Sequence, residues 1–379
     1  MLLTRVVLLS AVLTALFACS SEEVNPPAEL EAFTESAYFL ELWDTSVGSG
    51  DEDLRLALEP FIFNDVIYTV DVEGVVYALS LDNGEPLWES ELEFPVSGGL
   101  SGDGRHLYMA SFQGELIALN RESGEEVWRS MLSSESLSPV SSNGARVVVQ
   151  TSDGGVSSLS VDSGEQRWRY ASVAPLLSLR GTSAPQISGD QVIASFANGS
   201  LLSLDLASGL RTWETKIGQP QGRTELERLV DVDGYAAIQR DRLYTVSYQG
   251  KMMSLDLSSG SEIWSLPFSS YHGPAVGFNH LVAVSDDGKV HSLNKRNATS
   301  LWVNEQLLNR RVGAPTIWGD YVAVADFEGY IHLLNIETGE FAARIRPDSD
   351  GVMGRMLVSN DKLIVYTRSG DLVAYTLKN

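Results

Sequence analysis

The chain has 379 residues, of which 50 are acidic and 27 basic, so its formal net charge is −23 at pH 7. This charge argues against nucleic acid as a partner and against polybasic attachment to an anionic membrane, because both depend on clustered positive charge. Cys19 is the one cysteine of the sequence, which excludes an internal disulfide framework. The fold must therefore be held together by its core.

Residues 1–18 are typical of a secretory signal peptide. Arg5 lies near the start, and the apolar run from Val6 to Phe17 is too short for a comfortable membrane span. Ala18 directly before Cys19 resembles a bacterial lipobox, which implies cleavage before Cys19 and acylation of this residue. The alternative is an ordinary signal peptide with an uninvolved cysteine. Ser20 resembles the corresponding residue of sorted lipoproteins, which implies a lipid anchor at the periplasmic face of the outer membrane.

Residues 19–36 carry the acylated cysteine and are predicted to form a flexible tether. From Ser20 to Ser36 the sequence contains five Glu, two Pro and few large apolar residues. Such a composition buries too little apolar surface to fold by itself. Residues 37–379 are predicted to form one domain.

That domain is built from repeats. Gly74 is followed at a fixed distance by Trp88, and five further Gly–Trp pairs have the same spacing. Two weaker copies start at Gly329, with Ala343 in the tryptophan position, and at Gly370. The six strong copies are Gly74–Trp88, Gly114–Trp128, Gly154–Trp168, Gly199–Trp213, Gly250–Trp264 and Gly288–Trp302. Eight copies at this spacing indicate a repeat architecture.

Each copy has the pattern of short antiparallel strands. A small residue such as Ala78 precedes a bulky one such as Leu79, so the two faces of a strand differ in size. Gly84 supplies a hairpin turn. The sixth copy departs from this, with Ala298 after Asn297, and Asn tolerates a left-handed turn. With a further strand upstream and a Pro that opens many units, each unit reads as a four-stranded propeller blade.

The two ends of the domain are complementary. The last copy stops before its outer strand, and Phe39–Trp43 is an isolated strand ahead of the first unit. Pairing the two would remove the open edges. The sequence therefore predicts an all-β fold, an eight-bladed β-propeller of four-stranded antiparallel blades closed by the N-terminal strand. An open solenoid is the alternative.

The tryptophan series is explained by packing between blades, since each Trp brings a large buried area and one N–H donor. The repeats resemble the PQQ-like repeats of quinoprotein dehydrogenases. That resemblance would imply a quinone, a carboxylate base and a metal site, but the sequence shows no such cluster. The five histidines have no ligand spacing, and no nucleophile motif is present. We therefore expect no catalytic residue, no cofactor and no bound metal.

Two insertions break the period. Residues 174–181 place Leu177, Leu179 and Arg180 in a connection between blades, and residues 216–234 include Asp231 and Asp233. Insertions in repeat proteins map to loops, and loops carry function. Apolar residues beside charges are typical of a modest protein-binding surface. The alternative is that the leucines fold under the rim and the carboxylates are merely solvated.

Taken together, the lipobox, the eight blades and the two insertions, LLSLRGTSAPQI and GRTELERLVDVDG, resemble the BamB family over the whole chain. That family comprises lipoprotein subunits of the outer-membrane β-barrel assembly (BAM) machinery. The resemblance implies that Leu177, Leu179 and Arg180 contact the periplasmic POTRA region of BamA, with Asp231 and Asp233 extending this surface.

The same resemblance implies a non-enzymatic scaffold that aids insertion of β-barrel proteins into the outer membrane. Other BAM subunits and unfolded β-barrel precursors are the further partners to expect. Two alternatives stay open at this point. One is a quinone-dependent dehydrogenase, and the other is a propeller that binds a different protein of the cell envelope.

Overall fold

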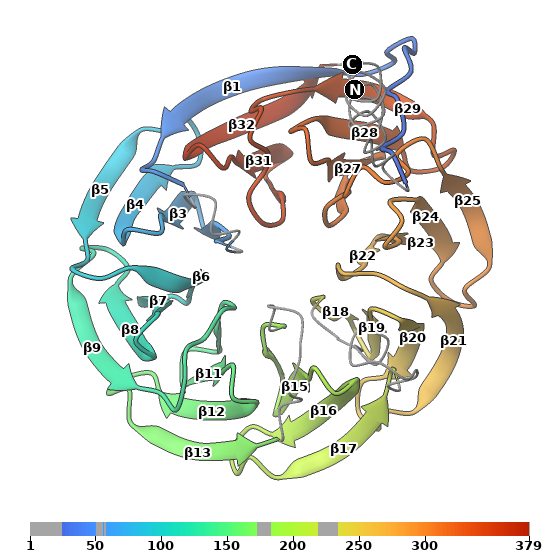
Figure 1. Ribbon diagram of the computed structural model, residues 1–379. Helices are drawn as coiled ribbons and strands as arrows, with labels where there is room; N and C mark the ends of the chain where they lie inside the picture. Colours follow the sequence, from blue (N-terminus) through green and yellow to red (C-terminus); the bar gives the residue numbers. More distant parts are fainter. Residues whose placement is uncertain (1–24, 51–55, 57, 173–182, 219–233, 379) are drawn as a thin grey trace, which may run out of the picture.

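The computed structural model describes residues 25–50, 56, 58–172, 183–218 and 234–378. These residues form thirty-two strands and no helix. The strands make eight four-stranded antiparallel sheets around a ring (Figure 1). The predicted all-β, eight-bladed propeller is thereby confirmed. Within the described ranges, no helix has the length and apolar character needed to cross a membrane.

Seven blades are continuous in sequence and run from the innermost to the outermost strand. Blade 1 comprises β2 (Phe61–Phe63), β3 (Val66–Val70), β4 (Val75–Ser80) and β5 (Pro86–Glu91); blade 2, β6 (Val96–Gly102), β7 (His106–Ser111), β8 (Glu115–Asn120) and β9 (Glu126–Met131). Blade 3 comprises β10 (Ser141–Ser142), β11 (Arg146–Gln150), β12 (Gly155–Ser160) and β13 (Gln166–Ala171); blade 4, β14 (Gln186–Ser188), β15 (Gln191–Ser195), β16 (Ser200–Asp205) and β17 (Arg211–Lys216). Blade 5 comprises β18 (Ala237–Gln239), β19 (Arg242–Val246), β20 (Gly250–Asp256) and β21 (Glu262–Phe268); blade 6, β22 (Ala275–Val276), β23 (His280–Val284), β24 (Val290–Asn294) and β25 (Ser300–Asn304); blade 7, β26 (Thr316–Trp318), β27 (Tyr321–Ala325), β28 (Ile331–Asn335) and β29 (Phe341–Ile345).

Blade 8 closes the ring with strands from both ends of the chain. It contains β30 (Leu357–Ser359), β31 (Lys362–Tyr366), β32 (Asp371–Lys378) and, outermost, β1 (Tyr38–Ser46). β1 pairs antiparallel with β32, from Tyr38 opposite Lys378 to Ser46 opposite Asp371 (Figure 1). The predicted closure by the N-terminal strand is confirmed, and the open solenoid is not observed.

Because successive strands are antiparallel, the connections alternate between two ends of each blade. The links from an outer strand to the next inner strand share one end with the turns between second and third strands, and we call this the insertion end. The turns between first and second strands, and between third and fourth strands, lie at the opposite end, which we call the turn end. The two ends form the two opposite faces of the propeller.

The tryptophans lie on the outermost strands opposite the small residues of the repeat. Trp128 is paired with Ala118 and Trp168 with Ser158, each beside a register shift. Their indole N–H groups donate to carbonyl groups of the following blade, at 2.7 Å for Val161 and 2.8 Å for Leu206. This geometry confirms that the tryptophans hold neighbouring blades together.

In six of the repeats, the second glycine provides room for the tryptophan of the preceding blade. A Cβ added to Gly164 would lie 2.5 Å from Cε3 of Trp128, and the φ of Gly164 is +66°. Ala298 takes this place in blade 6 with φ +60°, so the turn is kept at the cost of backbone strain.

Blade 7 compensates for its missing tryptophan. Its outer strand carries Ala343, which is paired with Leu333, so the large and small residues of this pair are exchanged. Both side chains are buried. The weak sequence match of the seventh copy is therefore a change in packing and not a lost blade.

The described part of the expected flexible tether, residues 25–36, is held on the ring. The carbonyl oxygens of Pro26 and Ala28 accept hydrogen bonds from Asn309 Nδ2 at 3.1 Å and Arg310 Nη1 at 2.9 Å. Further along, the backbone N–H of Ser36 donates to Ala342 at 2.9 Å, and Phe33 packs against Phe341. Hydrogen bonds and aromatic packing on blades 6 and 7 thus order a segment whose composition indicated flexibility. We call residues 26–36 the N-terminal strap.

Candidate functional site

The two predicted partner-binding insertions occupy equivalent places in adjacent blades. Residues 173–182 join β13 to β14, and residues 219–233 join β17 to β18. The described strands that flank each insertion are an outer strand and the next inner strand, and the ends of these strands nearest the insertions lie at the insertion end. The predicted partner-binding and lipidation residues lie outside the described residues; they are Leu177, Leu179, Arg180, Asp231, Asp233 and Cys19.

The described residues that follow the two insertions contact each other. Ser183 is the first described residue after one insertion, and Gly234 is the first after the other. Ser183 Oγ donates a hydrogen bond to the carbonyl oxygen of Gly234 at 3.3 Å. Three residues further on, Gln186 Nε2 donates to the carbonyl oxygen of Ala236 at 2.7 Å. The residues that follow the two insertions are thereby fixed side by side.

Close backbone packing restrains the end of the second insertion. A Cβ added to Gly234 would lie 2.3 Å from the backbone nitrogen of Gly273, and one added to Gly273 would lie 2.1 Å from the carbonyl oxygen of Tyr235. Only glycine permits this approach, because neither obstacle is a movable side chain. Residues 234–235 are thus held against the link between blades 5 and 6.

Tyr235 also connects across the centre of the ring to residues that precede blades 1 and 8. The Glu59 carboxylate lies close enough to the Tyr235 hydroxyl to affect its pKa, and it accepts a hydrogen bond from the backbone N–H of Arg355 at 3.3 Å. The Arg355 guanidinium lies 5.2 Å from the centroid of the Tyr235 ring. Burial raises the pKa of Glu59 above its ordinary value, although Arg355 and Tyr235 partly oppose this effect. Burial likewise raises the pKa of Tyr235. These three residues therefore join distant blades at the insertion end.

Beside them lies a central cavity of about 480 Å³. Its wall includes Pro60, Pro139 and Pro185, the prolines that the sequence places at the start of units. Among the described residues of this wall, Glu59 is the carboxylate, and it already interacts with Tyr235 and Arg355. Among the described residues, no group of three His, Cys, Asp or Glu side chains could hold a metal ion. The wall therefore does not fit a quinone with a metal and a free base.

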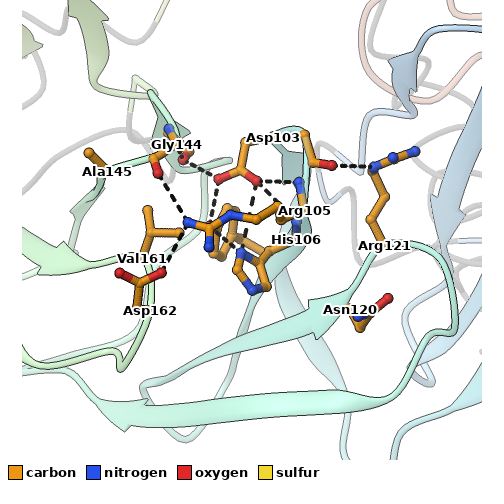
Figure 2. Close-up of polar contacts among 12 residues, drawn as sticks. Asp103, Arg105, His106, Asn120, Arg121, Gly144, Ala145, Val161 and Asp162 are labelled. Atoms are coloured by element: carbon orange, nitrogen blue, oxygen red, sulfur yellow. Dashed lines mark hydrogen bonds and ion pairs between the residues drawn. The ribbon is translucent and has the colours of Figure 1, made fainter.

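At the turn end, a buried polar cluster connects blades 2 and 3 (Figure 2). The Asp103 carboxylate accepts hydrogen bonds from Tyr108 Oη at 2.8 Å and Ser142 Oγ at 2.7 Å. Arg105 reaches from the same turn to the carbonyl oxygen of Gly144 at 3.3 Å and to Asp162 at 3.0 Å. These contacts tie the turns of neighbouring blades together.

The charge states within this cluster suit a structural role. Burial raises the pKa of Asp103, but hydrogen bonds from Ser142 and from the backbone and Tyr108 outweigh burial and hold it below its ordinary value. Burial lowers the pKa of His106 and raises that of Tyr108. Asp103 is therefore charged, and His106 and Tyr108 are neutral, near neutral pH. None is poised to exchange a proton there.

Sequence reasoning identified the two insertions but missed the residues that position them. Ser183, Tyr235, Glu59 and Arg355 have no repeat or motif that marks them as a group. Gly234 carried a weak signal, since it directly follows the aspartate pair of the second insertion. Their association depends on ring closure, which brings residues far apart in sequence to one centre.

Comparison with known proteins gives a consistent result. The sequence model of a family described as "Outer membrane protein assembly factor BamB" matches residues 72–304. A protein of that name from Pseudomonas aeruginosa is 50% identical over 372 residues, covering 98% of both chains. Another from Kangiella koreensis is 42% identical over 366 residues, covering 97% of this chain and 94% of the relative.

Solved structures agree with the sequence comparison. The crystal structure of BamB from Moraxella catarrhalis matches with a TM-score of 0.82 and 25% identity, over 89% of this chain and 100% of that one. A quinohemoprotein alcohol dehydrogenase from Comamonas testosteroni matches with a TM-score of 0.72 at 13% identity, over 89% of this chain and 76% of that one. At that identity the likeness to the dehydrogenase is one of fold alone.

Proposed function

The chain belongs to the BamB family of outer membrane protein assembly factors, and on this premise we propose that it is a scaffold subunit of the BAM complex. It binds the periplasmic POTRA region of BamA and aids the folding and insertion of β-barrel proteins. Family members are named as assembly factors rather than enzymes, so the dehydrogenase alternative is set aside.

The hydrogen bond between Ser183 and Gly234 supports this proposal most directly. A binding surface made from two separate loops needs a fixed spacing between them, because ordering flexible loops on binding reduces affinity. The described residues that directly follow the two insertions are joined. On this proposal Leu177, Leu179 and Arg180 contact the partner, and Asp231 and Asp233 extend the surface.

Acylation at Cys19 would place the insertion end toward the membrane. The N-terminal strap begins at Pro26, which is bound to Asn309 in an outer-to-inner link at the insertion end. The chain takes six residue-to-residue steps from Cys19 to Asn25, which span at most about 20 Å when extended. The anchor and the partner-binding insertions would then share one face of the propeller, at the periplasmic side of the outer membrane.

Calorimetry tests the proposal. The mature chain with Cys19→Ser is titrated with the isolated POTRA region of BamA from the same organism at fixed salt. We expect binding that Arg180→Glu weakens by about tenfold or more, as is typical of a central interface arginine. The matched control is Arg167→Glu, which makes the same charge change at a side chain paired with Glu165 on blade 3.

The outcomes separate the parts of the proposal. If Arg180→Glu binds as tightly as wild type, the site assignment is wrong while the partner stands. If wild type does not bind, the partner is a different protein of the cell envelope.

A further inference from the structure

A group of positive side chains lies at the turn end of blades 5 and 6, in a chain whose net charge is −23. Arg240 belongs to the turn before β19, Arg242 begins β19, and Lys295 and Arg296 belong to the turn after β24. Phe278, in the turn between β22 and β23, lies beside them. We call these five residues the basic patch.

Direct contacts hold the patch together. Lys295 Nζ donates hydrogen bonds to Gln239 Oε1 at 2.6 Å and to the carbonyl oxygen of Gly277 at 2.7 Å. The same nitrogen lies 6.0 Å from the centroid of the Phe278 ring. The turns of two blades are thus fastened to each other, and the cations are held on one surface.

The positive charges of the patch are not neutralised within the described chain. None of the four cations has a carboxylate at ion-pair distance there, whereas arginines of other blades such as Arg105, Arg129 and Arg211 do. Burial lowers the pKa of Lys295, and Arg240, Arg296 and Arg242 lower it further by repulsion. The cations therefore repel one another in the free protein.

An exposed aromatic ring accompanies these charges. Phe278 has 85% of its surface exposed, the largest fraction among the exposed large apolar residues of the described chain. Exposed apolar surface and clustered like charges are both unfavourable unless a partner covers them. Arginine and aromatic residues are also enriched where protein partners bind.

We propose that the basic patch binds an acidic segment of a second polypeptide, whose carboxylates pair with the arginines and whose apolar side chain packs on Phe278. A polypeptide is favoured over anionic lipid because the patch lies at the turn end, opposite the end where the N-terminal strap begins. This last argument rests on the proposed anchor at Cys19. The patch is also separate from the two insertions, so the chain would contact two partners at once.

Fluorescence anisotropy with defined probes tests the proposal. The probe is a short fluorescein-labelled peptide of glutamates interrupted by phenylalanines, added to the mature chain with Cys19→Ser. One control peptide has Lys for Glu, and another has Ser for Phe. We expect the acidic aromatic peptide to bind in a salt-sensitive manner and both control peptides to bind more weakly.

Protein variants locate the binding surface. Arg240→Glu combined with Arg296→Glu should weaken binding by about tenfold or more, and Phe278→Ser should also weaken it. Arg167→Glu combined with Arg211→Glu gives the same net charge away from the patch and should change binding little. Equal loss in both double variants would mean that net charge alone decides binding, which overturns the proposal.

Two further outcomes are informative. Vesicles of phosphatidylglycerol that bind wild type but not the patch variant, with no peptide binding, would show a lipid surface and overturn the polypeptide partner. POTRA binding by the patch variant should equal that of wild type. The two proposals can therefore fail independently.

Discussion

Ser183 and Gly234 are 51 residues apart, yet Ser183 Oγ lies 3.3 Å from the Gly234 carbonyl oxygen and both residues are buried. Each is the first described residue after one of the two insertions. This hydrogen bond therefore relates the residues that follow the two segments that the family resemblance identifies as partner-binding.

Loosening this junction should weaken the partner-binding surface. Ser183→Ala leaves the Gly234 carbonyl group without this donor and should lower the free energy of unfolding by about 1 kcal/mol. Gly234→Ala forces a backbone clash with Gly273 and should cost about 1–3 kcal/mol. Urea unfolding measures both effects. POTRA binding weaker than wild type, at a temperature where the fold persists, would show that the junction positions the surface, and unchanged binding in both variants would contradict it.

The turn glycines should resist substitution according to what their Cβ would meet. Gly144→Ala places alanine at φ +81° with no atom within 4 Å, so only the backbone strain of about 1–2 kcal/mol applies. Gly164→Ala adds the clash with Trp128 and should cost about 1–3 kcal/mol more. Denaturation midpoints compare the two variants. If Gly144→Ala and Gly164→Ala lowered stability equally, the Trp128 side chain would not need the space beside Gly164.

Ala298→Gly should stabilise the protein. Ala298 holds φ +60°, and its backbone N–H donates to Asn294 as the turn glycines of other blades donate in theirs. Glycine removes the backbone strain, but it also gives the unfolded chain more conformational freedom, which offsets part of the gain. The free energy of unfolding should therefore rise by about 0.5–1 kcal/mol. The control is Ala207→Gly. Ala207 is exposed in the corresponding turn region of blade 4 and does not have a positive φ, so this substitution should lower stability. A loss in both variants would refute the strain at Ala298.

Ring closure should depend on the N-terminal strand through Trp43. This side chain is buried and its indole N–H donates to the Leu81 carbonyl oxygen of blade 1 at 3.3 Å. Trp43→Ala should cost about 3–5 kcal/mol, whereas Leu40→Ala on the same strand, 48% exposed, should change stability by about 0.5 kcal/mol or less. Urea unfolding provides the comparison, and similar small effects would mean that closure by β1 adds little stability.

Stability should fall at acidic pH through His272. Burial lowers its pKa from 6.5 to about 4, so the folded state keeps it neutral. The neutral histidine makes its full contribution to the free energy of unfolding above pH 6.5. Below that pH the unfolded state takes up a proton that the folded state does not, and stability is lost down to about pH 4, by up to roughly 3 kcal/mol. The free energy of unfolding is measured near neutral pH and near pH 4 for wild type and for His272→Gln. The variant should lose less stability between the two pH values than wild type, and an equal loss would exclude this histidine as the cause.

Much of the fold could be predicted because its determinants are local and repeated. Gly164 marks a turn whatever the rest of the chain does, since its positive φ is a property of a few residues. The spare strand around Trp43 and the incomplete last unit predicted closure because their lengths match. Even the exchange of Leu333 and Ala343 left a visible trace, as the missing tryptophan of the seventh copy.

By itself, then, the sequence determined the number of blades, the ring closure and the two insertions that interrupt the period. The tertiary structure alone decided that Ser183 meets Gly234, that Tyr235 reaches Glu59, and that residues 26–36 pack on blades 6 and 7. It also decided that Lys295 and Arg240 share one surface. The physical reason is that such contacts depend on how eight twisted sheets curve into a ring, whereas the residues involved carry no periodic signal along the chain.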